Sequence, residues 1–259
     1  MSVSGAWRFT DELRDFIDFV YRPRLTPRLP GRVSGNGVWA DWLSLPSWRR
    51  LLQWAVFLWV INLVLLGPIA VAAAAAGGAQ HRLEIQAIPW LHALIWAPLV
   101  EELVFRYGMR RFVQALWLVP VSTVLMVTGP SLTAMLFLCA VLLLAIAPPA
   151  WRPAVLRRRR APGQAWALCR SWQLWFPWIF HLASLAFAAV HLYNFRLSAT
   201  PLWLLPLLVL PQWLTGLVLG WLRVRRGIGA AILLHATFNA GPLLLVWLIL
   251  QMLGDLSNF

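Results

Sequence analysis

The chain has 259 residues, of which 61% are hydrophobic and only 12% are charged. Because soluble domains carry about 25% charged residues, this composition excludes an ordinary soluble fold and predicts a protein that is partly solvated by lipid. The net charge of +13 comes from 22 basic residues, all of them arginine. These arginines lie between apolar runs, which is typical of membrane boundaries and of contact with anionic lipid, so nucleic-acid binding is not expected.

Residues 1–50 are predicted to form a cytoplasmic segment that precedes the membrane domain. Charged residues interrupt this region from the start, so it does not resemble a signal peptide. A linker rich in Arg, Pro and Gly follows at 22–37. Before it, apolar residues at helical spacing predict an amphipathic helix lying on the membrane surface, with a partner-binding helix as the alternative. These residues are Phe9, Leu13, Phe16, Ile17 and Val20.

Residues 51–259 are predicted to form an all-α transmembrane domain. Seven apolar segments each approach the roughly 20 residues that are needed to cross the hydrocarbon core. They lie at 51–76, 88–105, 112–127, 131–147, 174–193, 202–222 and 228–253. The third and fourth are short and are separated by a Thr-Gly-Pro turn, so we expect one inserted hairpin at about 112–147.

The arginines also predict the orientation of these spans. If the N-terminus is inside, the inside segments contain 20 arginines and the outside segments contain only Arg82 and Arg196. The positive-inside rule then predicts seven spans, with the N-terminus cytoplasmic and the C-terminus outside. The absence of lysine points to a GC-rich bacterial genome, so we expect a multi-pass protein of the bacterial inner membrane.

Two adjacent glutamates are the first candidates for chemistry. Of nine acidic residues, only Glu101 and Glu102 fall inside or at the end of an apolar segment, where an ionised group costs about 2.5–3.5 kcal/mol. Glu102 and Arg106 are four residues apart and share a helical face, so we predict an ion pair. A snorkelling pair at the membrane boundary would explain that pair without chemistry. Glu101 points about 100° away and has no cation nearby in sequence.

The histidines differ in their surroundings. His92 and His181 face away from Glu101 and His191 on their own helices, and a single histidine in a span is more often a packing residue than a ligand. His235 and Asn239 are four residues apart, so one helical face can present an imidazole and an amide to a cavity.

Three motifs in fixed order resemble those of a known family. The run EELVFR at 101–106 resembles the EExxFR motif of the CPBP family, which comprises CAAX proteases and bacteriocin-processing membrane enzymes. FAAVH at 187–191 is similar to the second motif of that family, FxxxH, and HATFN at 235–239 to the third, HxxxN. The resemblance covers about residues 88–245, which we take as the expected catalytic core. Other intramembrane proteases fit less well, since HExxH, GxGD and GxSG motifs are absent from the sequence.

The resemblance implies an intramembrane endopeptidase that hydrolyses a peptide bond in a membrane-associated protein or peptide. It implies roles for six residues: the general base Glu101, its supports Glu102 and Arg106, and His191, His235 and Asn239, which bind a metal ion or water and stabilise the oxyanion. A divalent ion such as zinc on His191, His235 and Glu101 and a metal-free glutamate mechanism use the same residues. Both alternatives stay open.

Two other functions and one geometric conflict remain. A non-catalytic scaffold or bacteriocin self-immunity protein of the same family is one alternative, and a haem or transport protein with paired histidines is another.

If the fifth span began at Pro177, His191 would lie roughly 21 Å along it, deeper than Glu101 and His235. A tilt, a kink or an inner extension of that helix would bring the three residues to one level.

Overall fold

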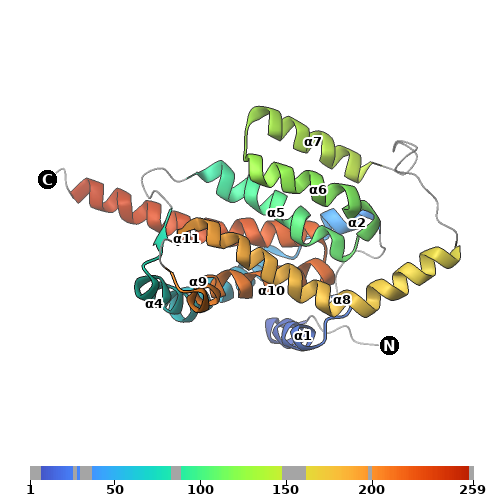
Figure 1. The fold of residues 1–259 in the computed structure, drawn as a ribbon, viewed down its shortest axis with the longest axis horizontal. Coiled ribbons are helices and arrows are strands. Elements are labelled where there is room, and N and C mark those ends of the chain that lie inside the picture. Colours follow the sequence, from blue (N-terminus) through green and yellow to red (C-terminus); the bar gives the residue numbers. More distant parts are fainter. Residues whose placement is uncertain are drawn as a thin grey trace.

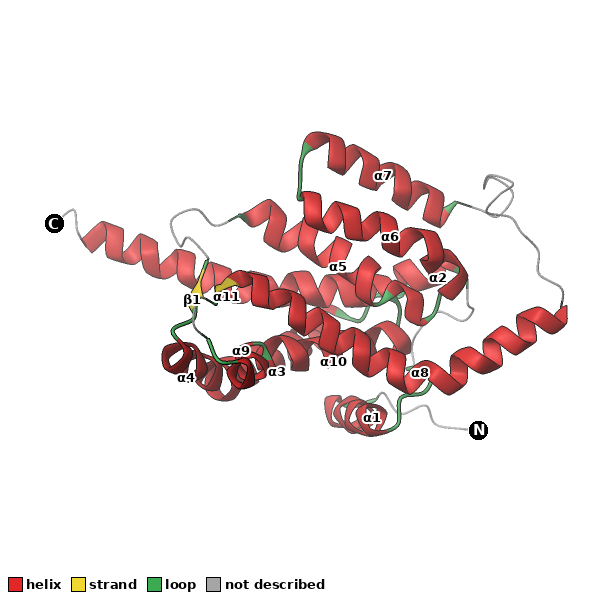
Figure 2. Cartoon of the chain, in the orientation of Figure 1, coloured by secondary structure: helices red, strands yellow, loops and turns green. Residues whose placement is uncertain are grey.

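A computed structural model describes residues 7–25, 28–29, 37–82, 89–147, 162–197 and 200–256, and their side chains except at 162–169 and 253–256. These residues form helices almost throughout, which confirms the all-α class (Figure 2). The exception within the described residues is a short antiparallel ladder, in which β1 (Gln80–His81) pairs with β2 (Phe195–Arg196).

Eleven α-helices are found in the described part of the chain. They are α1 (Phe9–Tyr21), α2 (Val38–Leu43), α3 (Trp48–Ile61), α4 (Gly67–Gly77), α5 (Ala97–Phe105), α6 (Phe112–Thr128), α7 (Leu132–Ile146), α8 (Pro162–Val190), α9 (Leu205–Leu208), α10 (Leu210–Arg225) and α11 (Ile228–Leu256). Five short helical turns join them: the π-helical η1 (Asn62–Leu66) and η2 (His92–Trp96), and the 3₁₀ turns η3 (Tyr107–Met109), η6 (His191–Asn194) and η7 (Leu202–Leu204).

Several of these helices can cross a membrane. Within the described residues, three are long and apolar enough: Trp48–Gly77, Arg170–Asn194 and Ile228–Met252. A fourth span results if η7 and α9 are counted with α10, from which they are bent by 51°. Helices α6 and α7 are apolar but shorter. The chain is therefore a membrane protein, whereas the count of seven spans and the sides of the two termini stay predictions.

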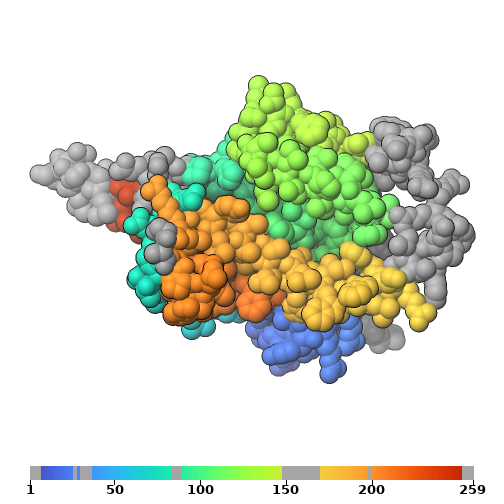
Figure 3. Space-filling view, viewed as in Figure 1, coloured from blue at the N-terminus to red at the C-terminus, as the bar shows by residue number. Residues whose placement is uncertain are grey.

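The first part of helix α11 lies among the other helices, where α11 contacts α3, α5, α10 and α2, and its C-terminal part projects away from them (Figure 1). Helix α5 packs between α11 and α6, and α6 packs against α7. The predicted hairpin is thus confirmed as α6 and α7. It forms the upper edge of the molecule in Figure 3. Its outer surface exposes apolar side chains, among them Val113, Leu116, Val124, Leu136 and Leu143, as expected for a lipid-facing element.

Prolines explain two unusual contacts of the central helices. In η2, the N–H of Ala97 bonds to the carbonyl of His92, and Pro98 has no N–H to donate. The carbonyl of Ala93 therefore has no helical donor, and the Asn239 amide donates to it over 2.9 Å. This hydrogen bond joins α11 to η2, because a buried carbonyl needs a hydrogen-bond donor.

Pro242 has the same effect in α11. It cannot donate to the carbonyl of Phe238 one turn earlier, and the indole N–H of Trp59 in α3 donates to that oxygen over 2.9 Å. A Cβ atom at Gly241 would overlap this indole ring, so the small residue permits the close approach of α3.

Helix α1 forms as predicted, but its apolar face packs on protein. Phe16 contacts Trp54 of α3 and Trp221 of α10, while Phe19 contacts Phe180 of α8. Both phenylalanines are buried. The prediction that this face rests on lipid is therefore wrong for Phe16, whereas Ile17 of the same predicted face is exposed. Hydrophobic periodicity identifies an apolar face without identifying what covers it.

Candidate active site

Glu102 and Arg106 form the predicted ion pair, but the pair is buried. An Nη1 atom of Arg106 donates to Oε1 of Glu102, and both side chains have no exposed surface. The Arg106 guanidinium also lies over the ring of Phe187, 3.9 Å from its centroid, where a cation is attracted by the aromatic face. The snorkelling interpretation is wrong, because the guanidinium is enclosed by protein and does not reach an interface.

The imidazole of His235 lies between the two glutamates. Its Nδ1 lies 3.0 Å from Oε1 of Glu102, within hydrogen-bond distance. Its Nε2 lies 3.9 Å from Oε2 of Glu101, which is too long for a direct hydrogen bond. Both atoms are thus available to a third group such as water. Glu101 Oε2 is buried and has no hydrogen-bond partner among the described residues.

Phe187 brings the third helix to the same place. Its ring centroid lies 4.7 Å from that of His191 and 5.6 Å from that of His235. His191 is also close enough to Glu101 to interact with it electrostatically. Of the three alternatives for the depth conflict, a tilt, a kink and an inner extension, the structure shows the extension, since α8 begins at Pro162 rather than near Pro177.

The orientation of His191 follows from the end of α8. Its Nδ1 lies 2.8 Å from the carbonyl of Phe187, one turn earlier. That carbonyl is an acceptor only, so Nδ1 carries the hydrogen and Nε2 is left for another group.

Asn239 is placed differently from the other predicted residues. It lies one turn after His235 on α11, but its amide nitrogen bonds to Ala93 in η2. It therefore connects α11 to the helix that carries Glu101. Among the described residues, no hydrogen bond joins its side chain to the glutamates or histidines.

The predicted metal ligands do not form a three-ligand set in this structure. Among the described residues, no group of three or more His, Cys, Asp or Glu side chains is arranged to hold a metal ion. A catalytic zinc site needs three protein ligands at about 2.0–2.2 Å. His191, His235 and Glu101 as placed do not fit that requirement, and no step proposed below depends on a metal.

Asp41 and Arg223 are buried residues that the sequence did not single out. Arg223 donates to the carbonyls of Arg106 and Tyr107 at the end of α5, over 3.1 Å each. Its Nη1 bonds to Asp41 over 2.6 Å, and Arg111 bonds to the other carboxylate oxygen over 3.2 Å. Asp41 lies between Trp and Leu residues in a short apolar run, which is a signal for a buried acid.

Two glycines near the start of α11 allow α2 to pack beside this network. A Cβ atom at Gly227 or Gly229 would overlap the backbone carbonyl of Asp41 or Trp42 respectively. The start of α11 can therefore approach α2 closely enough for Asp41 to reach Arg223.

Comparison with known proteins agrees with this site. A family model described as type II CAAX prenyl endopeptidase Rce1-like matches residues 83–241. The chain belongs to this Rce1-like family. All six predicted site residues lie within the matched segment, and the resemblance to CAAX proteases is confirmed. Members of the Rce1-like family are endopeptidases, which supports a membrane protease. No curated protein and no solved structure matches the chain.

Proposed function

We propose that this protein is an intramembrane endopeptidase in which Glu101 activates water. The observation that carries the proposal is the difference between two adjacent carboxylates. The Glu102 side chain is fully buried and its Oε1 is bound by Arg106 and His235, whereas the Glu101 carboxylate makes no hydrogen bond to another described residue and its side chain stays 16% exposed. A general base needs a free acceptor that water can reach.

The remaining residues support this base. Glu101 takes a proton from water, and the hydroxide formed adds to the scissile carbonyl carbon. The Nε2 atoms of His191 and His235 accept a hydrogen bond from the water and orient it, and in the imidazolium form the same Nε2–H groups donate to the oxyanion. The carbon–nitrogen bond then breaks, and Glu101 returns its proton to the leaving amine. Glu102 and Arg106 fix the imidazole of His235, and Asn239 positions α5 against α11.

The substrate that fits this placement is a protein or peptide associated with the bilayer, because the site lies among apolar helices. We expect the protein in the bacterial inner membrane. The glutamate mechanism requires no metal ion, and the segment at 88–245 provides the proposed catalytic core.

Substitution Glu101→Gln tests the proposal. It removes the base but keeps the shape, so we expect at least a hundredfold loss of peptide cleavage by the purified full-length protein with little change in Tm. Full activity of this variant would refute the assigned role.

Glu102→Gln is the informative comparison. It leaves the buried Arg106 charge without its partner, which costs about 3–5 kcal/mol of folding free energy. We expect a large fall in Tm for this variant only. The exposed Asp18→Asn serves as control and changes neither activity nor Tm.

A further inference from the structure

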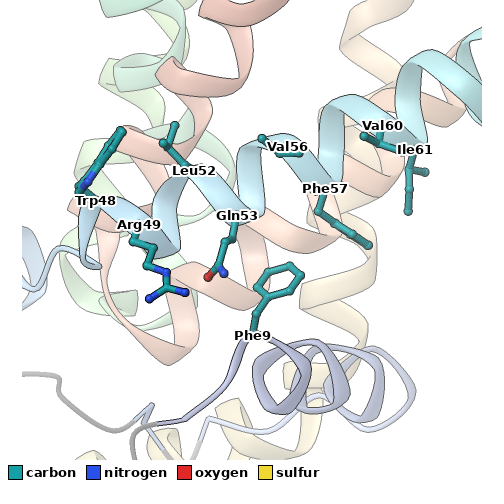
Figure 4. Close-up of a pocket in the computed structure, with 9 residues that line it drawn as sticks. All are labelled: Phe9, Trp48, Arg49, Leu52, Gln53, Val56, Phe57, Val60 and Ile61. Atoms are coloured by element: carbon teal, nitrogen blue, oxygen red, sulfur yellow. The ribbon is translucent and has the colours of Figure 1, made fainter.

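A groove runs along α3 and is bounded on one side by Phe9 at the start of α1, away from the residues of the active site. It has a volume of about 600 Å³, within the roughly 300–1,000 Å³ of small-molecule sites. Its walls are mostly apolar and include Leu52, Val56, Phe57, Val60 and Ile61. Arg49, Gln53 and Phe57 point from α3 toward Phe9 of α1 (Figure 4).

The groove continues into a polar pocket at the start of α3. The two cavities share Phe9, Arg49 and Gln53, and the polar one has a volume of about 460 Å³ and is also lined by Arg8 and Arg50. One continuous site thus has an apolar trough at one end and basic side chains at the other.

The arginines around the polar end differ in whether they are available to bind an anion. Arg50 is engaged by the buried Glu12, over 3.3 Å, and by Gln53. Asp11 accepts from the backbone N–H of Arg8 at the start of α1. The guanidinium groups of Arg8 and Arg49 are exposed, and no hydrogen bond or ion pair joins either of them to another described residue. The pocket therefore presents net positive charge to an anion.

The dimensions match one leaflet of a bilayer. Arg49 lies at the first turn of a candidate membrane span, Trp48–Gly77, where phosphate groups of lipids are found. From Leu52 to Ile61 the helix rises about 14 Å, which is close to half of the roughly 30 Å hydrocarbon core. The helix N-terminus adds a favourable dipole for a negative group.

We propose that this groove is a binding site for an anionic phospholipid. One acyl chain lies along α3 between Leu52 and Ile61, and the phosphate is held by Arg49 and Arg8. Because Phe9 of α1 lines the groove and Arg8 lines its polar end, the lipid contacts both the N-terminal segment and the membrane domain. The proposal is independent of the catalytic site.

Lipid binding to the purified full-length protein in detergent tests this site. The probes are phosphatidylglycerol and phosphatidylcholine with identical acyl chains, and native mass spectrometry measures the bound fraction. We expect preferential retention of phosphatidylglycerol. Each of Arg49→Gln and Arg8→Gln should weaken its binding about fivefold, whereas Arg14→Gln, at an exposed position of α1 outside the groove, should not.

A second pair of variants tests the apolar part. Val56→Trp fills the groove and should reduce binding of both lipids, whereas Val124→Trp on the exposed face of α6 should reduce neither. Both positions are exposed, so folding is preserved and a Tm measurement checks this. Equal binding of the two lipids, equal effects of Arg14→Gln and Arg49→Gln, or undiminished binding to Val56→Trp would overturn the proposal.

Discussion

At the scale of single residues, the contacts that each polar side chain already makes determine its role, even for neighbours in the chain. Glu101 and Glu102 are adjacent, yet the Glu102 carboxylate is fully enclosed with Arg106, whereas the Glu101 side chain stays 16% exposed. Asn239 shows the same principle. Its amide satisfies a carbonyl that Pro98 leaves without a helical donor, so its first task is to hold two helices together.

Asn239→Ala should therefore destabilise the protein as well as impair cleavage. The variant leaves the carbonyl of Ala93 without a donor, at a cost of about 1–3 kcal/mol, which thermal unfolding in detergent will measure. Thr237→Val is the control, because Thr237 bonds only to a carbonyl of its own helix. If Asn239→Ala abolished activity with Tm unchanged, the amide would act on the substrate directly.

At the scale of helices, close packing of α8 on α10 aligns the site. A Cβ atom at Gly216 would lie 3.1 Å from the Phe187 ring and 3.2 Å from the Ser184 carbonyl, and one at Gly220 would lie 2.8 Å from Phe180. Gly216 and Gly220 are four residues apart on one face of α10, and small residues at that spacing allow α8 to approach closely. Phe187 in turn contacts Arg106, His191 and His235.

Gly216→Val should displace Phe187 and disturb all three of these contacts. Overpacking of this kind costs about 1–3 kcal/mol, and we expect cleavage activity to fall more steeply than Tm, because the histidines lose their alignment. Gly37→Val is the control, since no atom of the described residues lies within 4 Å of its Cβ position. Unchanged activity of Gly216→Val would show that the ring does not position the histidines.

The docking of α2 should depend on pH. Burial acts to raise the pKa of Asp41, but Arg223 and Arg111 outweigh it and hold the pKa below the ordinary value of 3.8. A depressed folded-state pKa contributes stability that is present above pH 3.8 and is lost as the pH falls through the folded value.

Asp41→Asn tests this pH dependence through Tm in detergent. We expect the variant to be less stable than the natural protein at neutral pH, and the difference to shrink steadily below pH 3.8. The exposed Asp18→Asn should show no such convergence. A difference in Tm that stayed constant into acid would contradict the assignment.

At the scale of the whole molecule, the N-terminal helix is part of the folded protein. Glu12 bonds to Trp54 and Arg226, and Asp15 bonds to Arg225. These contacts join α1 to α3 and to the end of α10 (Figure 1). The end of α10 thus holds α1 through Arg225 and Arg226, and the end of α5 through Arg223.

Topology reporters will test the predicted orientation in the membrane. A reporter fused to the N-terminus should be active in the cytoplasm, and one fused to the C-terminus outside it, because seven spans place the two ends on opposite sides. An insertion in the arginine run at 157–160 should report the cytoplasm. Two termini on the same side would mean an even number of spans.

The sequence by itself determined the helical class, the membrane environment, the family and the pairing of Glu102 with Arg106. The family followed from the resemblance of three motifs, at 101–106, 187–191 and 235–239, to those of a known family. The other features follow from composition, periodicity or a spacing within one helix, and such local signals do not depend on the rest of the fold. The α6–α7 hairpin was predictable for the same reason, since its two helices are neighbours in the chain.

Only the tertiary structure decided which distant groups meet. His235 reaches across 133 residues to Glu102, and Arg223 across 182 residues to Asp41. No periodicity within one segment specifies these contacts. They depend on how separate helices pack, which is governed by side-chain shape, by glycines that allow close approach, and by carbonyls that a proline leaves without a helical donor. The same packing buries Phe16 of α1 against protein and leaves part of the Glu101 side chain exposed.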